Sequence, residues 1–383
     1  MKIELKYSND VMGNKTKKKR RRDDSSDDSD SDYIPTDEEQ APKKKSYSKP
    51  RKKTAKKTIS LDISDFNLDK ITNLEELILF GEYLKEKFGS KRGKKTGILK
   101  LIPGIPYLKD LQSMIGLNDL KTQIAKQIMF FILGLNSDEM MHTVISGPPG
   151  MAKTTVANKL GALYASLGFL SQGQVITACR SDLVGQYLGE TSIKTLEVLE
   201  ASVGGILLID EAYSLGDKYG RDSYSTECVN VINQFLSENP SDFMCIFAGY
   251  EKELKENLFN GNPGLERRFP WWFKLKEYTR EDLVDILLFQ LNKNEWVLDK
   301  EVTKEWLLKN IITDKNLFKN NGGDTLIFFD KCKITHSQRV ILLPENERKI
   351  LNIEDFKEGY KLFNFFKNSH NKQMSESMRA MYM

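Results

Sequence analysis

The stretch from Gly147 to Thr154, which reads Gly-Pro-Pro-Gly-Met-Ala-Lys-Thr, constrains this chain more than any other part of its sequence. It follows the segment 142–146, which is typical of a short buried strand, and precedes residues 155–160, which are typical of a helix. A glycine-rich turn that enters a helix directs several backbone N–H groups and the positive end of the helix dipole towards one point. This context predicts a loop that holds a polyphosphate.

The residues of this loop have distinct expected roles. Lys153 is expected to reach the β- and γ-phosphates of ATP, and the Thr154 hydroxyl to bind Mg²⁺, which prefers hard oxygen ligands. Thr155 is expected to be structural. Ala152 stands where the usual pattern has glycine; its methyl adds little strain at negative φ, whereas a positive φ would weaken nucleotide binding. The cofactor-binding set predicted here is Gly147, Pro148, Pro149, Gly150, Met151, Ala152, Lys153, Thr154 and Thr155.

A second motif is the apolar run 206–209 followed by two carboxylates, Asp210 and Glu211. Such a run is typical of a central parallel strand that is covered on both faces, and ligands bind at the carboxyl ends of these strands. Asp210 is expected to hold the Mg²⁺ shell through water, and Glu211 to polarise the water that attacks the γ-phosphate. The alternative is a buried strand that ends in an acidic turn. The presence of a phosphate loop favours the catalytic interpretation.

Three further segments complete a pattern: 210–215 (Asp-Glu-Ala-Tyr-Ser-Leu), 248–250 (Ala-Gly-Tyr) and 262–269 (Asn-Pro-Gly-Leu through Arg-Phe). With them the chain resembles the CbxX/CfxQ family of AAA+ ATPases. The resemblance runs from residue 106 to residue 340 and starts with a helix expected over 111–121, which carries Ile-Gly-Leu at 115–117. It implies an α/β P-loop NTPase core, with a parallel sheet and helices on both faces, and a small helical lid. It also implies Mg²⁺-dependent ATP hydrolysis in a hexameric ring.

The resemblance assigns roles outside the nucleotide loop. Arg268 would be the arginine finger that one subunit projects into its neighbour's site; Arg267 is the less suited candidate, and a surface basic pair is the alternative. Tyr187 and Leu188 would grip an extended polypeptide in a central pore, unless they belong to an ordinary loop with a buried tyrosine. The acidic segment 217–222 is either a second pore loop or a solvated turn.

Two positions near the nucleotide are less defined. Tyr250 would contact the attacking water or the γ-phosphate as part of the cofactor site, or else pack at the edge of the core. The family opens a lid helix with Gly-Asn-Ala-Arg, and the closest stretch here is Gly-Gly-Asp-Thr at 322–325, so the lid arginine is missing. Lys331, Lys333 and Arg339 lie one or more turns further along this helix, and none is an evident replacement.

Motifs and composition together give an expected order of domains. The helical element before the core is expected to begin at a capping box over 72–75, and prolines 103 and 106 mark its end. The predicted domains are a disordered charged tail (1–60), a small helical element and linker (61–105), an α/β ATPase core (106–278), a helical lid (279–368) and a flexible C-terminal tail (369–383).

The net charge of +4 comes from the amino-terminal tail, where the cationic stretch 15–22 precedes a run of only Asp and Ser over 23–32. This tail has three interpretations: a nuclear address in Lys17–Arg22, an arm for nucleic acid or an acidic partner, and a solubilising linker. The four cysteines show no C-x-x-C spacing, which indicates a reducing compartment. Without a run of 18 apolar residues, we expect a soluble intracellular protein, cytoplasmic or nuclear, that has no membrane partner.

Three functions follow from these observations. The first is a self-assembling hexameric motor that hydrolyses ATP between subunits and remodels an unknown protein substrate through a central pore. The second is a nucleotide-gated interaction protein with little turnover, which Ala152 and the missing lid arginine favour. The third is a nucleic-acid-associated ATPase that uses the basic tail. The phosphate loop, the acidic strand end and Arg268 together favour the first.

Overall fold

The computed structural model describes residues 2–6, 58–62, 71–89, 97–135, 140–187, 189–217, 221–239, 241–344 and 348–381. The chain divides into two compact units, Met1–Asn67 and Leu68–Met383. In the first unit, strand β1 (Lys2–Lys6) pairs antiparallel with strand β2 (Thr58–Asp62). The sequence analysis expected no regular structure over 1–60. The rest of that tail, including the basic stretch 17–22, lies outside the described residues.

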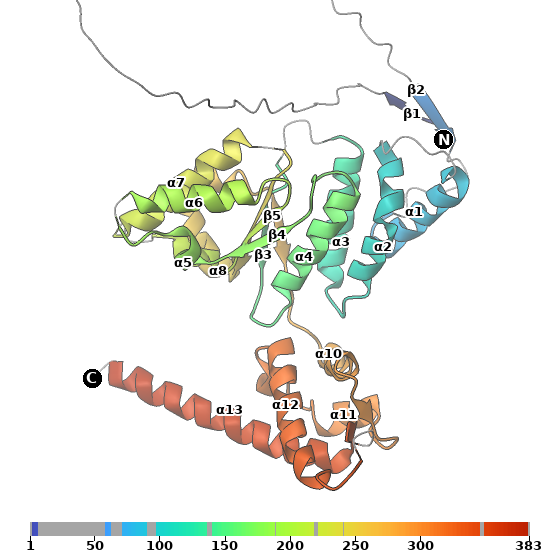
Figure 1. Cartoon of the computed structure of the whole chain (residues 1–383), viewed down its shortest axis with the longest axis vertical. Coiled ribbons are helices and arrows are strands. Elements are labelled where there is room, and N and C mark those ends of the chain that lie inside the picture. Colours follow the sequence, from blue (N-terminus) through green and yellow to red (C-terminus); the bar gives the residue numbers. More distant parts are fainter. Residues whose placement is uncertain are drawn as a thin grey trace, which may run out of the picture. The chain divides into compact units, whose positions relative to one another are not determined.

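The second unit is built on a five-stranded sheet with the order β4-β5-β6-β3-β7 (Figure 1). Every pairing in it is parallel, so all five strands end at the same edge. β5 has the bounds expected from the sequence, and β7 includes both tryptophans, 271 and 272. The strands are β3 (Thr143–Ser146), β4 (Val175–Ala178), β5 (Ile206–Ile209), β6 (Met244–Gly249) and β7 (Trp271–Lys274).

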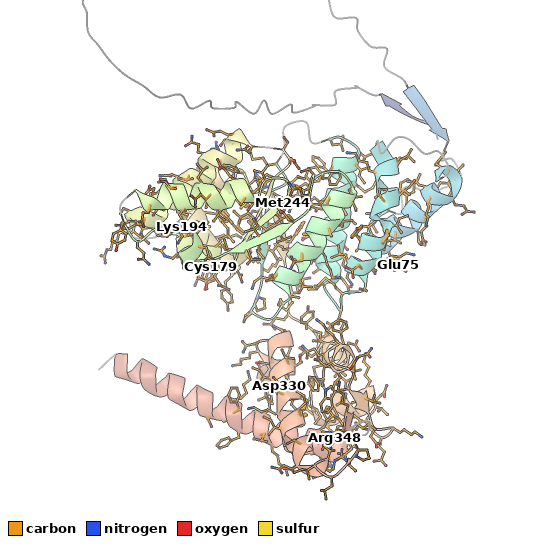
Figure 2. The ribbon with its side chains drawn as sticks, in the orientation of Figure 1. Glu75, Cys179, Lys194, Met244, Asp330 and Arg348 are labelled. Atoms are coloured by element: carbon orange, nitrogen blue, oxygen red, sulfur yellow. The ribbon has the colours of Figure 1, made fainter. Side chains whose placement is uncertain are left out.

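Helices cover both faces of this sheet (Figure 1). Side chains of a strand alternate between its faces. One face joins a single apolar cluster with helices α6 (Glu190–Ala201) and α7 (Ser223–Glu238). Helices α3 (Asn118–Ile132) and α4 (Lys153–Ser166) contact β7 and the β4–β5 pair, respectively. Met244 lies inside this body (Figure 2). The arrangement confirms the predicted α/β class.

Helices α1 and α2 begin the second unit and precede α3 and the first core strand. Asn73 caps α1 (Leu74–Phe88) by accepting from the backbone N–H of Glu76, one residue later in register than the expected capping box. Helix α2 (Leu101–Gln112) runs through both prolines, although the sequence analysis placed a boundary at 105/106. Pro103 lies in the first turn, where no helical hydrogen bond is lost, so only Pro106 removes one. Helix α2 packs against α4 and thereby joins the helical element to the core.

The segment 113–117 is a turn between α2 and α3, which corrects the single helix expected over 111–121. Gly116 and Leu117 have φ values of 64° and 57°, which a right-handed helix cannot include. Lys121 secures the turn from α3, because its Nζ donates to the backbone carbonyls of Gln112 and Met114 at 2.9 and 2.7 Å.

The part of the second unit after β7 is mainly helical. Helix α10 begins at a capping box of Thr279 and Asp282, at the residue where the helical lid was expected to start. The backbone of α13 continues to Met381, where the sequence analysis expected a flexible tail over 369–383; residues 369–381 contain neither glycine nor proline to end a helix. The elements are α10 (Arg280–Lys293), β8 (Val297–Leu298), α11 (Lys304–Asn310), α12 (Gly322–Arg339), β9 (Ile350–Leu351) and α13 (Ile353–Met381).

Short helical segments complete the described chain. They are α5 (Arg180–Leu183), α8 (Glu251–Glu253), α9 (Pro263–Glu266), three 3₁₀ segments (Gly97–Lys100, Ala212–Leu215, Lys315–Phe318) and one π-helical segment (Leu254–Phe259). No helix within the described ranges has both the length and the apolar character needed to cross a bilayer.

His142 ties β3 to β6 from inside the core. Its Nδ1 accepts the backbone N–H of Cys245 at 3.0 Å, so the neutral ring carries its proton on Nε2, which is buried and has no partner among the described residues. The rings of Phe243 and Phe269 lie 5.8 Å from it. Burial, together with the positive charge of Arg268, lowers the pKa of His142 to about 3.

This burial predicts a loss of stability in mild acid. His142 is neutral in the folded chain and protonates near pH 6.5 when unfolded, so the free energy of unfolding should fall as pH drops from 6.5 towards about 3. The contribution of this one residue is at most about 1.4 kcal/mol per pH unit. In His142→Asn, an amide oxygen can still accept from Cys245, but nothing titrates. Urea unfolding between pH 7.5 and 4.5 should show a shallower loss for the variant; equal losses would contradict this account.

Candidate functional site

The glycine-rich loop joins β3 to α4 at the carboxyl edge of the sheet. The backbone N–H of Gly147 donates to the carbonyl of Gly249, at the end of β6, at 3.1 Å. Gly150 has a φ of 71°, and a Cβ there would lie 1.9 Å from the carbonyl oxygen of Asn320. Only glycine fits at position 150, because both the backbone angle and the lack of space exclude a side chain.

Ala152 does not have the negative φ at which its methyl group would add little strain. Its φ and ψ are 56° and 30°, so it lies in the left-handed region immediately before α4, not in the first helical turn. A Cβ in this region is close to the following carbonyl oxygen, at a cost of roughly 1–2 kcal/mol. Glycine would adopt the backbone conformation at position 152 without strain, but in this chain the residue there is alanine.

The residues that follow face the loop or the solvent. Lys153 Nζ lies over the loop, 3.2 Å from the carbonyl oxygen of Gly147 and 3.3 Å from that of Pro148. Thr154 is exposed at the first turn of α4, where its hydroxyl is accessible to a ligand. Thr155, expected to be structural, is also exposed and lines a cavity. Met151 is buried, so it contributes its backbone to the loop and its side chain to the core.

The two carboxylates stand at the end of β5. The Oδ1 atom of Asp210 accepts the backbone N–H of Glu211 at 3.1 Å. Glu211 has φ and ψ of 50° and 43°, a left-handed conformation that directs the chain into a 3₁₀ turn. Its Oε2 is buried without a hydrogen-bond partner among the described residues. A buried and unsatisfied carboxylate oxygen is costly in a purely structural turn, and it is available to orient a water molecule.

Two tyrosines lie beside Glu211, and the sequence analysis gave a role to only one of them. A hydrogen bond with Glu211 is the main cause that raises the pKa of Tyr213, and burial raises it further. Burial and the charge of Glu211 raise the pKa of Tyr250, whose ring lies 6.0 Å from that of Tyr213 and 5.9 Å from Lys153 Nζ. Tyr250 is thus close to both the carboxylate and the lysine, while Tyr213 holds the carboxylate. The signal in the sequence that could have identified Tyr213 is its position two residues after Glu211.

A cavity of about 640 Å³ lies between the loop, the 113–115 turn and the helices α10 and α12. This volume suits a nucleotide, and the sequence analysis did not predict the residues that the lid contributes. The loop and the start of α4 contribute Gly150, Ala152 and Thr155, and the rest of the lining mixes apolar and polar side chains. It includes Met114, Ile115, Ile286, Phe289 and Leu326 together with Asp110, Lys159, Gln290, Lys293 and Asn294.

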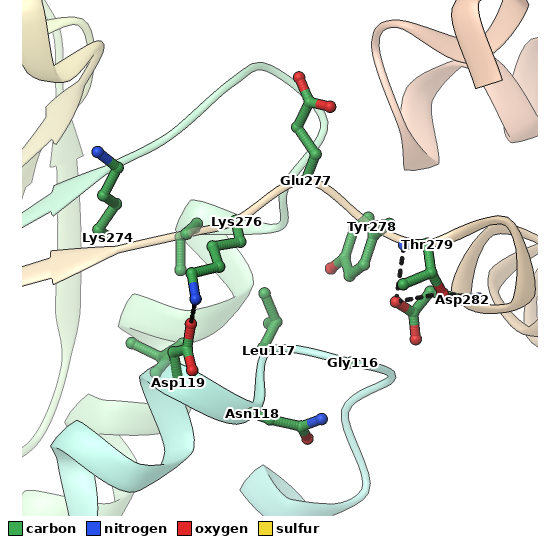
Figure 3. A pocket seen from close by; sticks show the side chains of 12 residues that line it. Gly116, Leu117, Asn118, Asp119, Lys274, Lys276, Glu277, Tyr278, Thr279 and Asp282 are labelled. Carbon is green, nitrogen blue, oxygen red and sulfur yellow. Dashed lines mark hydrogen bonds and ion pairs between the residues drawn. The ribbon is translucent and has the colours of Figure 1, made fainter.

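A second, smaller pocket of about 270 Å³ lies where β7 leads into α10 (Figure 3). An ion pair between Lys276 and Asp119 spans it at 2.6 Å. Tyr278 is buried and approaches Gly116, where any Cβ would lie 3.2 Å from the tyrosine ring. Burial and the nearby charge of Asp282 raise the pKa of Tyr278 to about 12. These contacts hold the connection between β7 and α10 against the 113–117 turn, part of which lines the larger cavity.

The residues considered as substitutes for the missing lid arginine are engaged within the lid. Lys331 lies 4.8 Å from the ring centroid of Phe366, and Lys333 pairs with Asp330 at 2.6 Å. Arg339 pairs with Asp355 at 2.8 Å. Thr325, at the position of the family arginine, is buried and donates to the carbonyl of Gly322.

The hydrogen bonds of Arg268 are made to residues outside the glycine-rich loop. Its Nη1 donates to the carbonyl of Gly264 at 2.6 Å, and its Nε donates to Ser237 Oγ at 2.9 Å. Arg267 is exposed. A half-buried guanidinium held by two partners keeps a defined direction, as a group that acts on a neighbouring subunit requires. Its role in a neighbouring site stays a prediction.

The predicted pore segment forms a tight, exposed turn. Tyr187 is 69% exposed, so it is not the buried tyrosine of the alternative interpretation; Leu188 lies outside the described residues. Lys194 of α6 holds the base of the turn by donating to the carbonyls of Ser181 and Val184 (Figure 2).

An ion pair connects helix α5, which precedes the predicted pore residue Tyr187, to the acidic segment 217–222. Arg180, which begins α5, pairs with Asp222 at 2.6 Å, and the backbone N–H of Asp222 donates to Asp217. Residues 218–220 lie outside the described ranges. The two candidate pore segments are therefore connected at their bases.

The left-handed Ala152 leads to a stability prediction. Ala152→Gly should raise the free energy of unfolding by about 0.5–1 kcal/mol, because the relief of strain exceeds the added entropy of the unfolded chain. The matched control is Ala162→Gly within α4, which should lower it by about 1 kcal/mol. Urea unfolding of both variants measures the difference. A destabilised Ala152→Gly would show that the alanine is not strained.

Comparison with known proteins agrees with this geometry. The ATPase family associated with various cellular activities (AAA) matches residues 143–263. A cfxQ-like protein of Acanthamoeba polyphaga mimivirus is 31% identical over 327 residues, covering 84% of this chain and 77% of that protein. The chloroplastic ribulose bisphosphate carboxylase/oxygenase activase of Cyanidioschyzon merolae is 35% identical over 246 residues, covering 62% and 84%. Stage V sporulation protein K of Bacillus subtilis is 34% identical over 220 residues, covering 55% and 66%. The chain therefore belongs to the CbxX/CfxQ family of AAA+ ATPases.

Proposed function

We propose that this AAA+ protein is an Mg²⁺-dependent ATPase that assembles into a hexameric ring and remodels a protein substrate through its central pore. The observation that carries the proposal is the meeting of Lys153, Tyr250 and Glu211 at one edge of the sheet, beside a nucleotide-sized cavity. Opposite charges around a phosphate site and an unpaired carboxylate oxygen are the groups that phosphoryl transfer to water needs.

The residues present fit ATP and Mg²⁺. The backbone N–H groups of the loop and the Lys153 ammonium are donors for the β- and γ-phosphates. The exposed Thr154 hydroxyl and Asp210 would hold Mg²⁺, which when bound neutralises charge on the phosphate oxygens. Glu211, fixed by Tyr213, would orient the attacking water, and Tyr250 would stand close to the γ-phosphate. Arg268 of a neighbouring subunit would stabilise the charge that develops during transfer.

A second candidate function is a nucleotide-gated interaction protein with little turnover. The strained Ala152 and the buried Thr325, in place of the lid arginine, favour it. Both candidates bind ATP, so the rate of hydrolysis separates them. The names of two relatives refer to ribulose bisphosphate carboxylase/oxygenase activation and to sporulation. The substrate proposed for this chain is therefore a class, a protein with an extended segment.

Glu211→Gln should reduce steady-state ATP hydrolysis by at least about 100-fold while ATP binding persists, because the amide cannot accept a proton from water. Arg268→Ala should cause a similar loss, as removal of a transition-state cation does. The matched controls are Glu238→Gln at the end of α7 and Arg267→Ala next to Arg268, both at exposed positions. Phosphate release over a range of protein concentrations measures the activity.

Mixing the two inactive variants tests the shared site. Each Arg268→Ala protomer retains Glu211, and each Glu211→Gln neighbour retains Arg268, so some interfaces in a mixed ring regain every catalytic group. Activity should reappear on mixing and should rise with protein concentration. Activity that is independent of concentration, with no recovery on mixing, would contradict a ring with shared sites and would favour a site complete within one chain.

Tyr187→Ala should weaken the stimulation of hydrolysis by an unfolded polypeptide, for which casein is the probe, by at least about 5-fold because a large apolar contact is lost. The control is Tyr107→Ala on α2, which removes another exposed tyrosine outside the pore segment. Casein titrations of both variants provide the comparison. Equal stimulation of the two variants would remove Tyr187 from the proposed pore.

A further inference from the structure

The segment that leads into α12 lies directly on the phosphate loop. The backbone N–H of Gly322 donates to the carbonyl of Gly150 at 3.3 Å, and the Asn321 amide Nδ2 donates to the carbonyl of Pro149 at 3.2 Å. The carbonyl of Asn320 occupies the space that a side chain on Gly150 would need. Three consecutive lid residues thus contact two consecutive residues of the loop through neutral groups.

Asn321 is an unusual residue to find at this contact. Its side chain is 1% exposed, and its Oδ1 is buried without a hydrogen-bond partner among the described residues. Its backbone has φ and ψ of 49° and −121°, a region that residues with a side chain rarely adopt. Backbone strain and an unused amide oxygen both cost free energy, and such features persist where the surroundings fix them. The amide donor to Pro149 is the favourable interaction that this position provides across the contact.

A buried carboxylate holds this segment from behind. Asp324 is fully buried; its Oδ2 accepts the backbone N–H of Asn320 at 2.9 Å, and its Oδ1 accepts the side-chain amide of Asn320 at 3.1 Å. Lys367 of α13 pairs with the same carboxylate at 2.5 Å and is itself largely buried. The position of the segment on the phosphate loop therefore depends on a charge supplied by α13.

We propose that Asn321 is a positioning residue that latches the lid onto the phosphate loop and controls the release of nucleotide, in place of the lid arginine that this chain lacks. Asp324 and Lys367 hold the latch in position. The inference rests on the proposed function only in requiring that a nucleotide occupy the cavity between loop and lid. Gly150 and Gly322 both line that cavity, so a nucleotide inside it leaves when the two separate.

The first test compares Asn321→Gly with Asn310→Ala. Glycine adopts the Asn321 backbone angles without strain and retains the Gly322 to Gly150 hydrogen bond, so the variant loses the amide contact with Pro149 across the interface and the amide contact with Lys319 within the lid. Asn310 donates its amide to the carbonyl of Trp306 in α11, away from the loop, and is the matched control. Release of a fluorescent N-methylanthraniloyl ATP analogue, chased by excess ATP, measures the latch without requiring hydrolysis.

Asn321→Gly should release the probe about 3- to 10-fold faster than the unmodified chain, with an unchanged or higher unfolding temperature, because one neutral hydrogen bond across the contact is lost. Asn310→Ala should release it at the unmodified rate. Equal release from Asn321→Gly and the unmodified chain would overturn the latch. Failure of the unmodified chain to bind the probe would instead overturn the proposed function, so the two failures are distinguishable.

A second pair of variants tests the support from α13. Lys367→Met leaves Asp324 buried without its cation, whereas Lys361→Met removes an exposed lysine that pairs with Glu358 on the same helix. Lys367→Met should release the probe faster than Lys361→Met, while probe association stays similar, because the latch loosens without a change in the loop. Identical release from the two lysine variants would separate α13 from the latch and overturn that part of the inference.

Discussion

The shared direction of the five strands places every polar group of the site at one edge of the sheet. The strand order puts β6 between β3 and β5, so the loop after β3, the carboxylates after β5 and Tyr250 after β6 follow three adjacent strands. Their separation in sequence does not matter once the strands are parallel and in register, since each ends at the same level. The apolar runs that make these strands central also exclude water from the base of the site, which strengthens the electrostatic interactions there.

Three residues around this edge have a strained backbone. Ala152, Glu211 and Asn321, half of the six non-glycine residues with positive φ in the described chain, lie respectively in the glycine-rich loop, directly after β5 and in the lid contact. Conformations of this kind cost of order 1–3 kcal/mol each and persist only when packed surroundings fix them. Here the surroundings are the ends of buried strands and a buried ion pair, so the fold supplies the rigidity that holds these three residues in position.

Local patterns predicted what depends on local structure. The bounds of β5, the loop before α4 and the start of the lid at residue 279 each follow from neighbouring residues, and the structure contains them. The left-handed Ala152 was not predicted, because its angle depends on how the loop closes against the lid. The prolines of α2 were taken as a boundary, although one occupies a first turn and the helix is held by packing on α4. The contact of Asn321 with Pro149 spans 172 residues, and no periodicity in the sequence reports it.

The missing lid arginine changes the kind of signal that can pass between nucleotide and lid. An arginine attracts phosphate directly, so its pull changes with the number of phosphate charges. In this chain the described contacts from the lid to the loop are an amide and backbone groups, which respond to the shape of the loop more than to its charge. The charged group that does reach this contact, Lys367, acts from behind through Asp324 and belongs to α13. A movement of α13 that separated this pair would leave a buried carboxylate unpaired, which is strongly unfavourable. The proposed latch would therefore transmit the state of α13 to the phosphate loop as well as the reverse, since coupling between two positions is reciprocal.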